Sequence, residues 1–430
     1  MTNNHSPQSL AAALLIGMTA STFGAGFQLA ERSGSGLGRA YSGEAAIADD
    51  ASIIASNPAG MSLLDDMSFA VGMNVILPNI DAAGIAPDGA GGFVPNSDQD
   101  VAADGYVPYL FLTKKINDQW TVGFGSYTTY GLKSNYSSDF SAQSGTDFSE
   151  LFSFNLNPSI SYRLNNQWSF GAGIDLLYAD GTINSRTFAA VPGAPAAAVG
   201  TNLFNLEGDD WGFGYNIGVL FELSERTRFG LHYRSAIDLS LTGASDVGPV
   251  LGAGAGLGGP AVLDTTLDVE LPDTLEFSAY HEINDRWAIH GDVLWTGWSK
   301  FQELAPKTGN AIVDDAVFVE ENWTNTFRFS AGTTYKHNDR LTLRAGVAYD
   351  ESPVTDATRT LRIPDADRIW ASIGLTYKLN ECYNLDFGYT YIFADDAFVN
   401  FEAAGGNESA FQGNVSGSVN LFALGVSGSF

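Results

Sequence analysis

The sequence has little of what metal sites and nucleic-acid-binding proteins require. Among its 430 residues there is one cysteine, Cys382, which excludes an intrachain disulfide and a cysteine metal cluster. The five histidines form no HExxH pair, so we predict no metal and no cofactor. Lys and Arg number 21 against 49 Asp and Glu, for a formal charge of −28. Because such a polyanion repels a phosphate backbone, nucleic acid is excluded as a partner.

Long apolar runs are also missing. No segment has eighteen consecutive apolar residues, so no transmembrane helix is expected. The short apolar run SLAAALLIGMTA, residues 9–20, is followed by small residues, as in a secretory signal peptide, although no Lys or Arg precedes it. Thr22 and Gly24 occupy the small positions for cleavage before Ala25. We therefore predict a signal peptide at residues 1–24 and export of the chain.

From about Met67 onward, apolar and polar residues alternate. In Trp168–Tyr178 the apolar residues occupy the even positions, while mostly small or polar residues occupy the odd ones. Leu341–Asp350 and Ile369–Leu379 repeat the pattern. Alternation over about ten residues is typical of a strand with one apolar and one polar face. Charged residues are only 16% of the chain, which argues against long soluble helices.

Short polar turns separate these segments. Each turn lies between two alternating segments, as in a hairpin. The six turns are INDQW (116–120), LNNQW (164–168), LSERT (223–227), INDRW (283–287), KHNDR (336–340) and LNECY (379–383). Six hairpins supply twelve strands, and one strand before and one after the series bring the number to fourteen. Longer connections, such as 181–208 and 244–263, alternate with the turns.

Short turns on one side, long loops on the other and an even strand number describe an outer-membrane barrel. We predict an all-β membrane protein in which residues 67–430 form a 14-stranded antiparallel barrel in the bacterial outer membrane. Trp120, Trp168 and Trp287 directly follow short turns, where an interfacial aromatic girdle belongs. The alternative is a soluble β-sandwich, whose strands are usually shorter.

Residues 25–66 do not alternate. They mix small residues, short helix-like pieces and breakers, and Asp50 or Ser52 can cap a short helix. Fourteen strands enclose a lumen wider than side chains alone fill. We therefore predict that residues 25–66 form a small helical hatch that plugs the lumen.

The glycine-rich stretch GSGLGRAYSGEA, residues 34–45, could suggest a phosphate-binding loop. A dinucleotide fingerprint would need Gly where Arg39 stands, and a Walker loop would need Lys and Ser or Thr at Glu44 and Ala45. We interpret the glycines as allowing tight turns and close packing inside the barrel. Arg39 and Glu44 are then candidates for polar anchors of the plug.

At these residues the chain resembles a known family. The segment GFQLAERSGSGLGRAYSGEAAIADDASIIASNPAG, residues 26–60, is similar to the hatch of the long-chain fatty acid outer-membrane transporter (FadL) family. The similarity continues through YRLNNQWSFGAG (162–173), WGFGYNIGVLFEL (211–223) and IPDADRIW (363–370). It implies a hatch-plugged barrel of fourteen strands that takes up long-chain fatty acid or another hydrophobic small molecule without ATP. We expect a monomer surrounded by outer-membrane lipid and lipopolysaccharide.

The resemblance also implies functional residues. Hatch movement would involve Phe27, Gln28 and Leu29 together with Asn57, Pro58 and Ala59. In the family a kink in the third strand opens the wall for lateral exit, and Gly131 matches it; a packing glycine is the alternative. Two apolar loops, residues 188–204 and 247–263, would capture ligand, unless they are only flexible linkers.

A fatty acid also needs a cation for its carboxylate. Arg186 lies near the family's carboxylate-contacting arginine, although lumen salt bridging is the more ordinary role for such a residue. Thr324 stands where the resemblance leads us to expect a Lys, and Arg328 lies in a lumen-facing phase that compensates. The missing Lys favours an alternative ligand class, neutral aromatic or aliphatic hydrocarbons.

Enzyme chemistry is not predicted. His290 and Asp292 share one strand face, but no nucleophilic Ser or oxyanion donor is identifiable beside them. An outer-membrane hydrolase and a purely structural barrel remain as lower alternatives to transport.

Overall fold

The computed structural model describes residues 25–87, 92–140, 142, 146–187, 200–400 and 411–430. The signal peptide predicted at residues 1–24 lies outside the described residues, as does most of the apolar loop 188–204. The N-terminal hatch and the barrel are therefore described almost completely.

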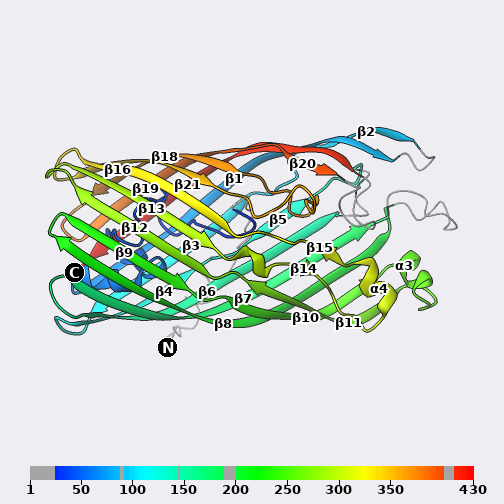
Figure 1. Ribbon diagram of the computed structural model, residues 1–430, viewed down its shortest axis with the longest axis horizontal. Helices are drawn as coiled ribbons and strands as arrows, with labels where there is room; N and C mark the ends of the chain where they lie inside the picture. The colour runs from blue at the N-terminus through cyan, green and yellow to red at the C-terminus, as the bar shows by residue number, and fades with distance from the viewer. Residues whose placement is uncertain (1–24, 88–91, 141, 143–145, 188–199, 401–410) are drawn as a thin grey trace, which may run out of the picture.

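Fourteen strands of the described chain form a closed antiparallel ring, which confirms the sequence prediction (Figure 1). The ring closes where β1 (Met67–Pro87) pairs with β21 (Gln412–Ser429), from Ser68–Ser429 to Ile85–Gln412. The other twelve are β3 (Gly105–Lys115), β4 (Trp120–Tyr127), β6 (Phe148–Arg163), β7 (Trp168–Arg186), β8 (Asn202–Ser224), β9 (Thr227–Arg234), β12 (Thr274–Glu282), β13 (Trp287–Thr296), β16 (Thr326–Lys336), β17 (Leu341–Asp350), β18 (Arg368–Lys378) and β19 (Tyr383–Ala394).

Further strands extend this ring toward the end opposite the tight turns, which we call the outer end (Figure 1). They are β2 (Phe93–Asp98), β5 (Leu132–Asn135), β10 (Ile237–Val247), β11 (Ala261–Leu271) and β20 (Ala397–Asn400). A separate short pair, β14 (Glu303–Leu304) and β15 (Val319–Glu320), and the helices α3 (Pro249–Gly254) and α4 (Ala311–Ala316) belong to the outer loops. A further short helix, η5 (Trp298–Lys300), follows β13.

Five of the six short turns are closed by an Asn side chain. In the turn before β7, Asn165 Oδ1 accepts hydrogen bonds from the backbone N–H groups of Gln167 (2.8 Å) and Trp168 (2.9 Å). Asn117, Asn284, Asn338 and Asn380 do the same in four other turns. Asn satisfies turn donors in this way at little conformational cost. The repeated Asn therefore sets the tight hairpins from which the strand number was predicted.

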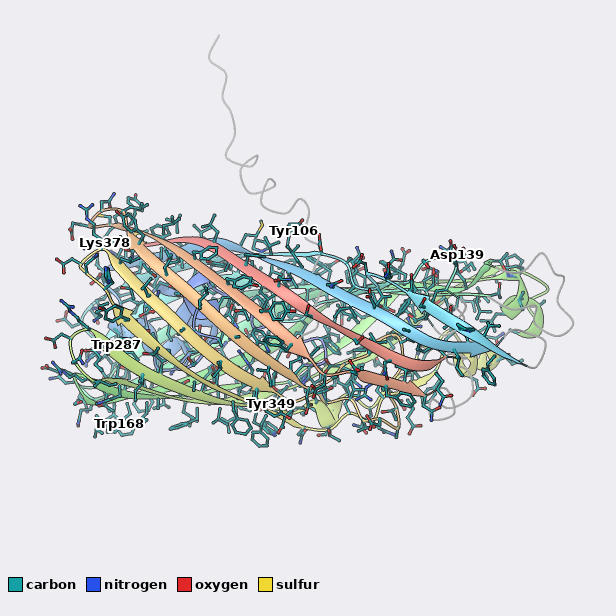
Figure 2. All side chains as sticks on the ribbon, turned by 90° about the horizontal axis from the view of Figure 1, so that it is seen from above. Tyr106, Asp139, Trp168, Trp287, Tyr349 and Lys378 are labelled. Atoms are coloured by element: carbon teal, nitrogen blue, oxygen red, sulfur yellow. The ribbon has the colours of Figure 1, made fainter. Side chains whose placement is uncertain are left out.

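The strands have the alternating faces that the sequence predicts. In β7, Trp168, Phe170 and Ile174 are exposed, whereas Ser169 and Asp175 are buried toward the lumen. Figure 2 shows side chains projecting outward all along the barrel, with Trp168 and Trp287 near one end. This outward apolar face meets the membrane hydrocarbon. No helix among the described residues is long and apolar enough to cross a membrane.

Residues 25–66 lie inside the end of the barrel that carries the tight turns (Figure 1). They contain three short helices: α2 (Gly34–Leu37), η2 (Ala51–Ala55) and η3 (Pro58–Leu63). As expected, Asp50 caps η2, because its carboxylate accepts from the Ser52 N–H at 2.8 Å. η3 contacts β6, β7 and β8, and α2 contacts β18, β19 and β21. The hatch therefore touches opposite sides of the lumen.

Glycines of the barrel wall make room for the hatch backbone. A Cβ atom on Gly346 would lie 2.1 Å from the carbonyl oxygen of Arg39, and one on Gly230 would lie 1.9 Å from that of Ala45. Any larger residue would overlap the hatch at these positions. Glycines inside strands, which otherwise weaken a sheet, are here required by close backbone approach.

We expect Gly346→Ala to loosen the hatch while the barrel still closes, because its Cβ must displace the Arg39 backbone. Overpacking of this kind costs about 1–3 kcal/mol. Limited proteolysis of the purified protein should cleave residues 25–66 faster than in the wild type. Gly291→Ala is the matched control, since its Cβ would meet only the Ser330 carbonyl oxygen at 3.5 Å. Equal protection of the hatch in both variants would contradict this account.

Candidate functional site

An apolar cavity lies in the outer half of the lumen, above the hatch. It is narrow, with a volume of about 70 Å³. Its lining is mostly aliphatic and comes from β6, β7, β8, β10 and β11, with Leu206, Leu239, Leu241, Leu267 and Leu271 among the residues. Such a lining suits a hydrocarbon chain.

The apolar surface continues from this cavity to the outer loops. Leu304 and Val319 of the β14–β15 pair belong to the same buried cluster, as do Ala255 after α3 and Val313 of α4. α3 contacts α4, and the Asn310 side-chain amide donates to the Ala255 carbonyl at 3.2 Å. Ile312 on α4 is exposed. Buried apolar contacts therefore extend from the cavity to the outer loops.

The first residues of the hatch close the inner end of the cavity. We call residues 25–29 the strap. Phe27 is buried, lines the cavity, and packs among Trp298, Phe301 and Trp323. The Gly26 N–H donates to the carboxylate of Asp365 at 2.9 Å. The strap is therefore held by one buried ring and by an outer-loop carboxylate.

The strap also completes an interrupted strand of the wall. β4 ends at Tyr127 and β5 begins at Leu132. Between them, Leu29 N–H donates to the Thr129 carbonyl (2.8 Å) and Gly131 N–H donates to the Phe27 carbonyl (2.9 Å). Gln28 and Tyr130 form the antiparallel bridge between the two segments. Gly131, expected at a kink, thus lies where the third strand turns inward and pairs with the strap.

The ladder between β3 and β4 is incomplete beside this break. Its last pair is Leu110–Ser126, and the next bridge on that side is Ala102–Ser134. The wall therefore lacks continuous strand pairing next to the strap.

The second predicted gating triplet fixes residues 33–66, which we call the hatch body. The Asn57 side-chain amide donates to the carbonyls of Ala45 (2.7 Å) and Val219 (3.0 Å), and its Oδ1 accepts from the Ala59 N–H (3.1 Å). Pro58 begins η3, where its missing N–H costs nothing. The structure places this triplet against β7 and β8, away from the strap.

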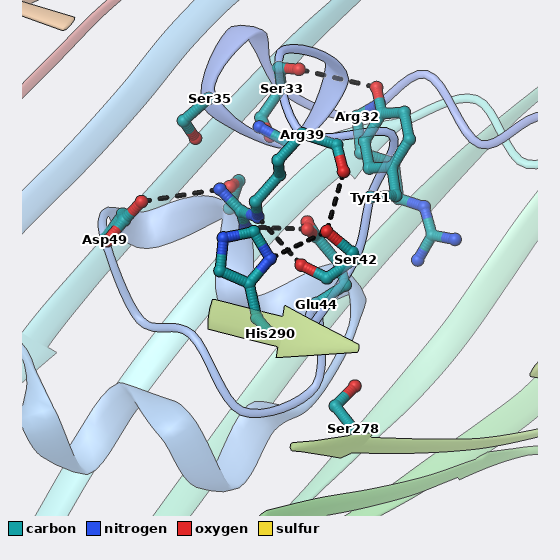
Figure 3. Close-up of polar contacts among 12 residues, drawn as sticks. Arg32, Ser33, Ser35, Arg39, Tyr41, Ser42, Glu44, Asp49, Ser278 and His290 are labelled. Atoms are coloured by element: carbon teal, nitrogen blue, oxygen red, sulfur yellow. Dashed lines mark hydrogen bonds and ion pairs between the residues drawn. The ribbon is translucent and has the colours of Figure 1, made fainter. Parts of the chain in front are cut away.

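A polar cluster on the other side fixes the same body (Figure 3). Arg39 pairs with Glu44 at 2.7 Å, and Arg344 of β17 pairs with Asp49 at 2.9 Å. Burial would raise the pKa of Asp49, but Arg344 and Arg39 outweigh it and lower this pKa to about 2. The Arg344–Asp49 ion pair therefore joins the hatch body to the wall, and the Arg39–Glu44 pair holds the hatch body together.

His290 belongs to this cluster and has no catalytic setting. Its Nδ1 is hydrogen-bonded to Ser42 Oγ at 2.7 Å, and its Nε2 faces Thr334 Oγ1 at 3.1 Å rather than a carboxylate. Asp292 instead bonds to Ser278. The described residues contain no group of His, Cys, Asp and Glu that could hold a metal ion.

The two cations expected from sequence lie outside the outer cavity. Arg186, at the outer end of β7, pairs with Asp147 at 2.8 Å and lines a different, polar hollow. Arg328 donates to the Ala40 carbonyl at 2.8 Å, stacks over the Trp370 ring, and lines a small inner cavity of about 20 Å³ beside Gln28. Thr324 contacts the Pro353 carbonyl.

Arg362 supplies a cation to the cavity lining instead. It is buried, and its guanidinium donates to Ser149 Oγ at 2.6 Å and to Ser185 Oγ at 3.4 Å. Sequence analysis missed it because it comes from the loop between β17 and β18, where no periodicity assigns a face. The one sequence feature that pointed to Arg362 was its position directly before the segment IPDADRIW, which resembles the family.

Comparison with known proteins agrees with this architecture. The family described as "Outer membrane protein transport protein (OMPP1/FadL/TodX)" matches residues 15–430. The chain belongs to the OMPP1/FadL/TodX family. This membership places it in the bacterial outer membrane as a transport protein for hydrophobic compounds, not an enzyme.

Individual members of the OMPP1/FadL/TodX family are similar over most of their length. The "Long-chain fatty acid transport protein" of Escherichia coli O6:H1 is 37% identical, over 89% of this chain and 90% of that protein. "Outer membrane protein P1" of Haemophilus influenzae is 33% identical, over 90% and 89%. A Pseudomonas aeruginosa FadL homologue superposes with a TM-score of 0.83 at 25% identity, covering 94% of this chain and all of that one.

The Asp49 ion pairs predict an acid-sensitive hatch. An unpaired Asp has a pKa of about 3.9, and the ion pairs lower that of Asp49 to about 2. The ion pairs therefore stabilise the docked hatch fully above pH about 4, and this stabilisation is lost as the pH falls through about 2. The melting temperature of the wild type should fall as the pH is lowered across this window. Asp49→Asn should have a lower melting temperature at pH 7 and a smaller fall. Parallel pH profiles for the two proteins would refute the assignment.

Proposed function

We propose that this protein takes up long-chain fatty acids by passive, ligand-gated diffusion. The observation that carries the proposal is the position of Phe27, which closes the inner end of an apolar cavity while its backbone pairs with the break in the third strand. Curated relatives at about 35% identity that are named for long-chain fatty acid transport support the substrate class.

The proposed path begins at the apolar surface of α3 and α4. The acyl chain then enters the outer cavity, and the strap leaves its seat. The acid finally exits between β3 and β4 beside Gly131. With lateral exit the ligand does not have to pass the hatch body, which the contacts of Asn57 and Asp49 keep docked.

The free-energy balance of this exchange depends on acyl length. Releasing the strap breaks two backbone hydrogen bonds and the bond from Thr296 Oγ1 to Gln28 Oε1, each worth about 0.5–1.5 kcal/mol. The bond from Gly26 to the Asp365 carboxylate costs about 1.5–3 kcal/mol more. Unseating the buried side chains of Phe27 and Leu29 costs about 1.5–3 kcal/mol each. Burying an acyl chain gains about 0.8 kcal/mol per methylene, so about eight to seventeen buried methylenes are needed to exceed the cost. Short acids therefore cannot open the gate, because a ligand shifts an equilibrium only by its differential affinity.

We assign the carboxylate contact in the outer cavity to Arg362. Arg186 then acts only at the rim, where Asp147 already pairs with it. Arg328 lies in the inner cavity with Gln28, so a carboxylate would meet it only after the strap has moved.

A neutral hydrocarbon is the second candidate ligand. Thr324 in place of a cation and the aliphatic cavity lining favour it. The fold is shared with the Pseudomonas putida toluene transporter TodX at a TM-score of 0.69 and 17% identity, a likeness of fold alone.

Uptake of labelled oleate and toluene in a transporter-deficient host separates these candidates. We expect the chain to speed oleate entry, and Arg362→Ala to weaken it about tenfold, since a charge-assisted hydrogen bond is worth about 1.5–3 kcal/mol. Toluene entry should not respond to Arg362→Ala, and Arg186→Ala should change oleate uptake less than about twofold. If neither compound enters faster than in the empty host, the transport proposal is wrong.

A reversible cross-link tests the gate. Gln28 and Tyr130 form a non-hydrogen-bonded antiparallel pair, the closer type, so cysteines at both positions can form a disulfide. In a Cys382→Ser background, Gln28→Cys with Tyr130→Cys should abolish oleate uptake until reductant is added. Each single-cysteine variant serves as the control. Uptake that persists in the oxidised double variant would show that the strap does not need to move.

A further inference from the structure

Four aromatic rings surround Phe27. Its ring centroid lies 4.8 Å from that of Trp298, 5.3 Å from Phe301, 5.6 Å from Trp323 and 6.0 Å from Tyr130. Trp298 and Phe301 meet the Phe27 ring edge-on, at 73° and 77°. These are the arrangements that aromatic pairs prefer because of their quadrupoles. We call the four surrounding residues the aromatic cage.

Three residues of the aromatic cage, Trp298, Phe301 and Trp323, are held by contacts outside the strap. The Phe301 N–H donates to the Trp298 carbonyl at 2.9 Å, and the Trp323 N–H donates to the Phe301 carbonyl at 3.3 Å. The Trp323 indole N–H donates to Glu321 at 2.7 Å. Trp298 and Trp323 also pack on each other at 4.9 Å. The cage should therefore persist when Phe27 leaves.

The cage adjoins the outer cavity, because the cage residue Phe301 and the enclosed Phe27 both line that cavity. The strap backbone packs directly against the cage at Gly26, where a Cβ would lie 2.4 Å from the Trp323 ring. Gly26 also has a φ of +63°, which favours glycine. No room is left in the cage while the strap is docked, and release of the strap frees a space the size of a benzene ring.

We propose that the aromatic cage is a binding site for an aromatic ring at the end of a ligand, and that Phe27 is its internal occupant. The favoured ligands are long-chain acids that end in an aryl group. This inference rests on the proposed function, since the ligand must reach the cage through the outer cavity. The acyl part lies in that cavity, and the terminal ring replaces Phe27 against Trp298 and Phe301.

An alkyl terminus can fill the same space but loses the edge-on ring contacts. Aromatic pairs contribute beyond their buried area, so an aryl acid regains on entry what the departing Phe27 gives up. We expect an aryl acid to bind about fivefold more tightly than an alkyl acid of equal length.

The test compares phenyl-terminated dodecanoate with hexadecanoate, a probe of similar length. Binding of each is measured by calorimetry on the purified full chain in detergent. The wild type should prefer the phenyl acid about fivefold, and Trp298→Leu should remove the preference while affinity for hexadecanoate changes less than about twofold. Phe301→Leu, which keeps an apolar side chain at the other edge-on contact, should weaken the preference too. The heat-dependent gel shift of the barrel checks that each variant is folded.

Trp211→Leu is the matched control, because Trp211 is 55% exposed on the outer surface of β8. It should keep the full preference. Equal affinity of the wild type for the two acids, or a preference retained in both cage variants, overturns the aromatic cage as a ring site and leaves fatty acid transport standing. Failure of both acids to bind the wild type, together with absent oleate uptake, overturns the proposed function itself.

Discussion

The ladder between β1 and β21 is the constraint on which the rest of this protein depends. In hydrocarbon an unpaired backbone N–H or C=O costs several kcal/mol, so a sheet can cross the membrane only if its first and last strands meet. Here they pair from Ser68–Ser429 to Ile85–Gln412, and Met67 also exchanges two hydrogen bonds with the last residue, Phe430. Closure at fourteen strands encloses a lumen that side chains alone do not fill. The hatch fills part of that lumen.

The fit of the hatch body supports the proposal that it stays in place during transport. Wall glycines such as Gly230 and Gly346 let its backbone touch the strands, and the pairs of Arg39 with Glu44 and of Arg344 with Asp49 compensate buried charge. Removing one partner of such a pair would leave an uncompensated charge, which is strongly destabilising. The strap has no comparable ion pair among the described contacts. It is held by Phe27, by the Asp365 carboxylate, by the Thr296 hydroxyl and by two backbone hydrogen bonds, and in the proposed mechanism it is the part that a hydrophobic ligand displaces.

Local sequence patterns were enough to predict the strand faces, the strand number and the presence of a hatch. Alternation assigned the faces of β7, β17 and β18, and the repeated Asn turns led to the strand number. The breakers around Asn57-Pro58 marked a hatch, and the capping role of Asp50 was foreseen. Long-range contacts were beyond such reasoning. Nothing local indicates that Phe27–Leu29 pairs with Thr129–Gly131, because neither segment has the length or alternation of a strand.

Loop residues were the hardest to assign, because their position depends on how the loop folds over the lumen. Arg186 had the expected place in the chain, yet Arg362 is the arginine that lines the cavity. Trp298 and Trp323 lie between β13 and β16, where no period assigns a face, so the aromatic cage could not be foreseen. The glycines of residues 34–45 are a partial success: Gly38 approaches Gly374 of the wall, as close packing requires, and Arg39 and Glu44 pair with each other.

The central claim is that the strap moves on ligand binding while the hatch body stays docked. Electron-spin distance measurements in lipid bilayers test it directly, with one label in the turn at Asp118 and the second at either Gln28 in the strap or Ala48 in the hatch body. In a Cys382→Ser background, saturating oleate should lengthen and broaden the Gln28–Asp118 distance and leave the Ala48–Asp118 distance unchanged. An unchanged Gln28–Asp118 distance, or an equal shift of both pairs, would contradict the account.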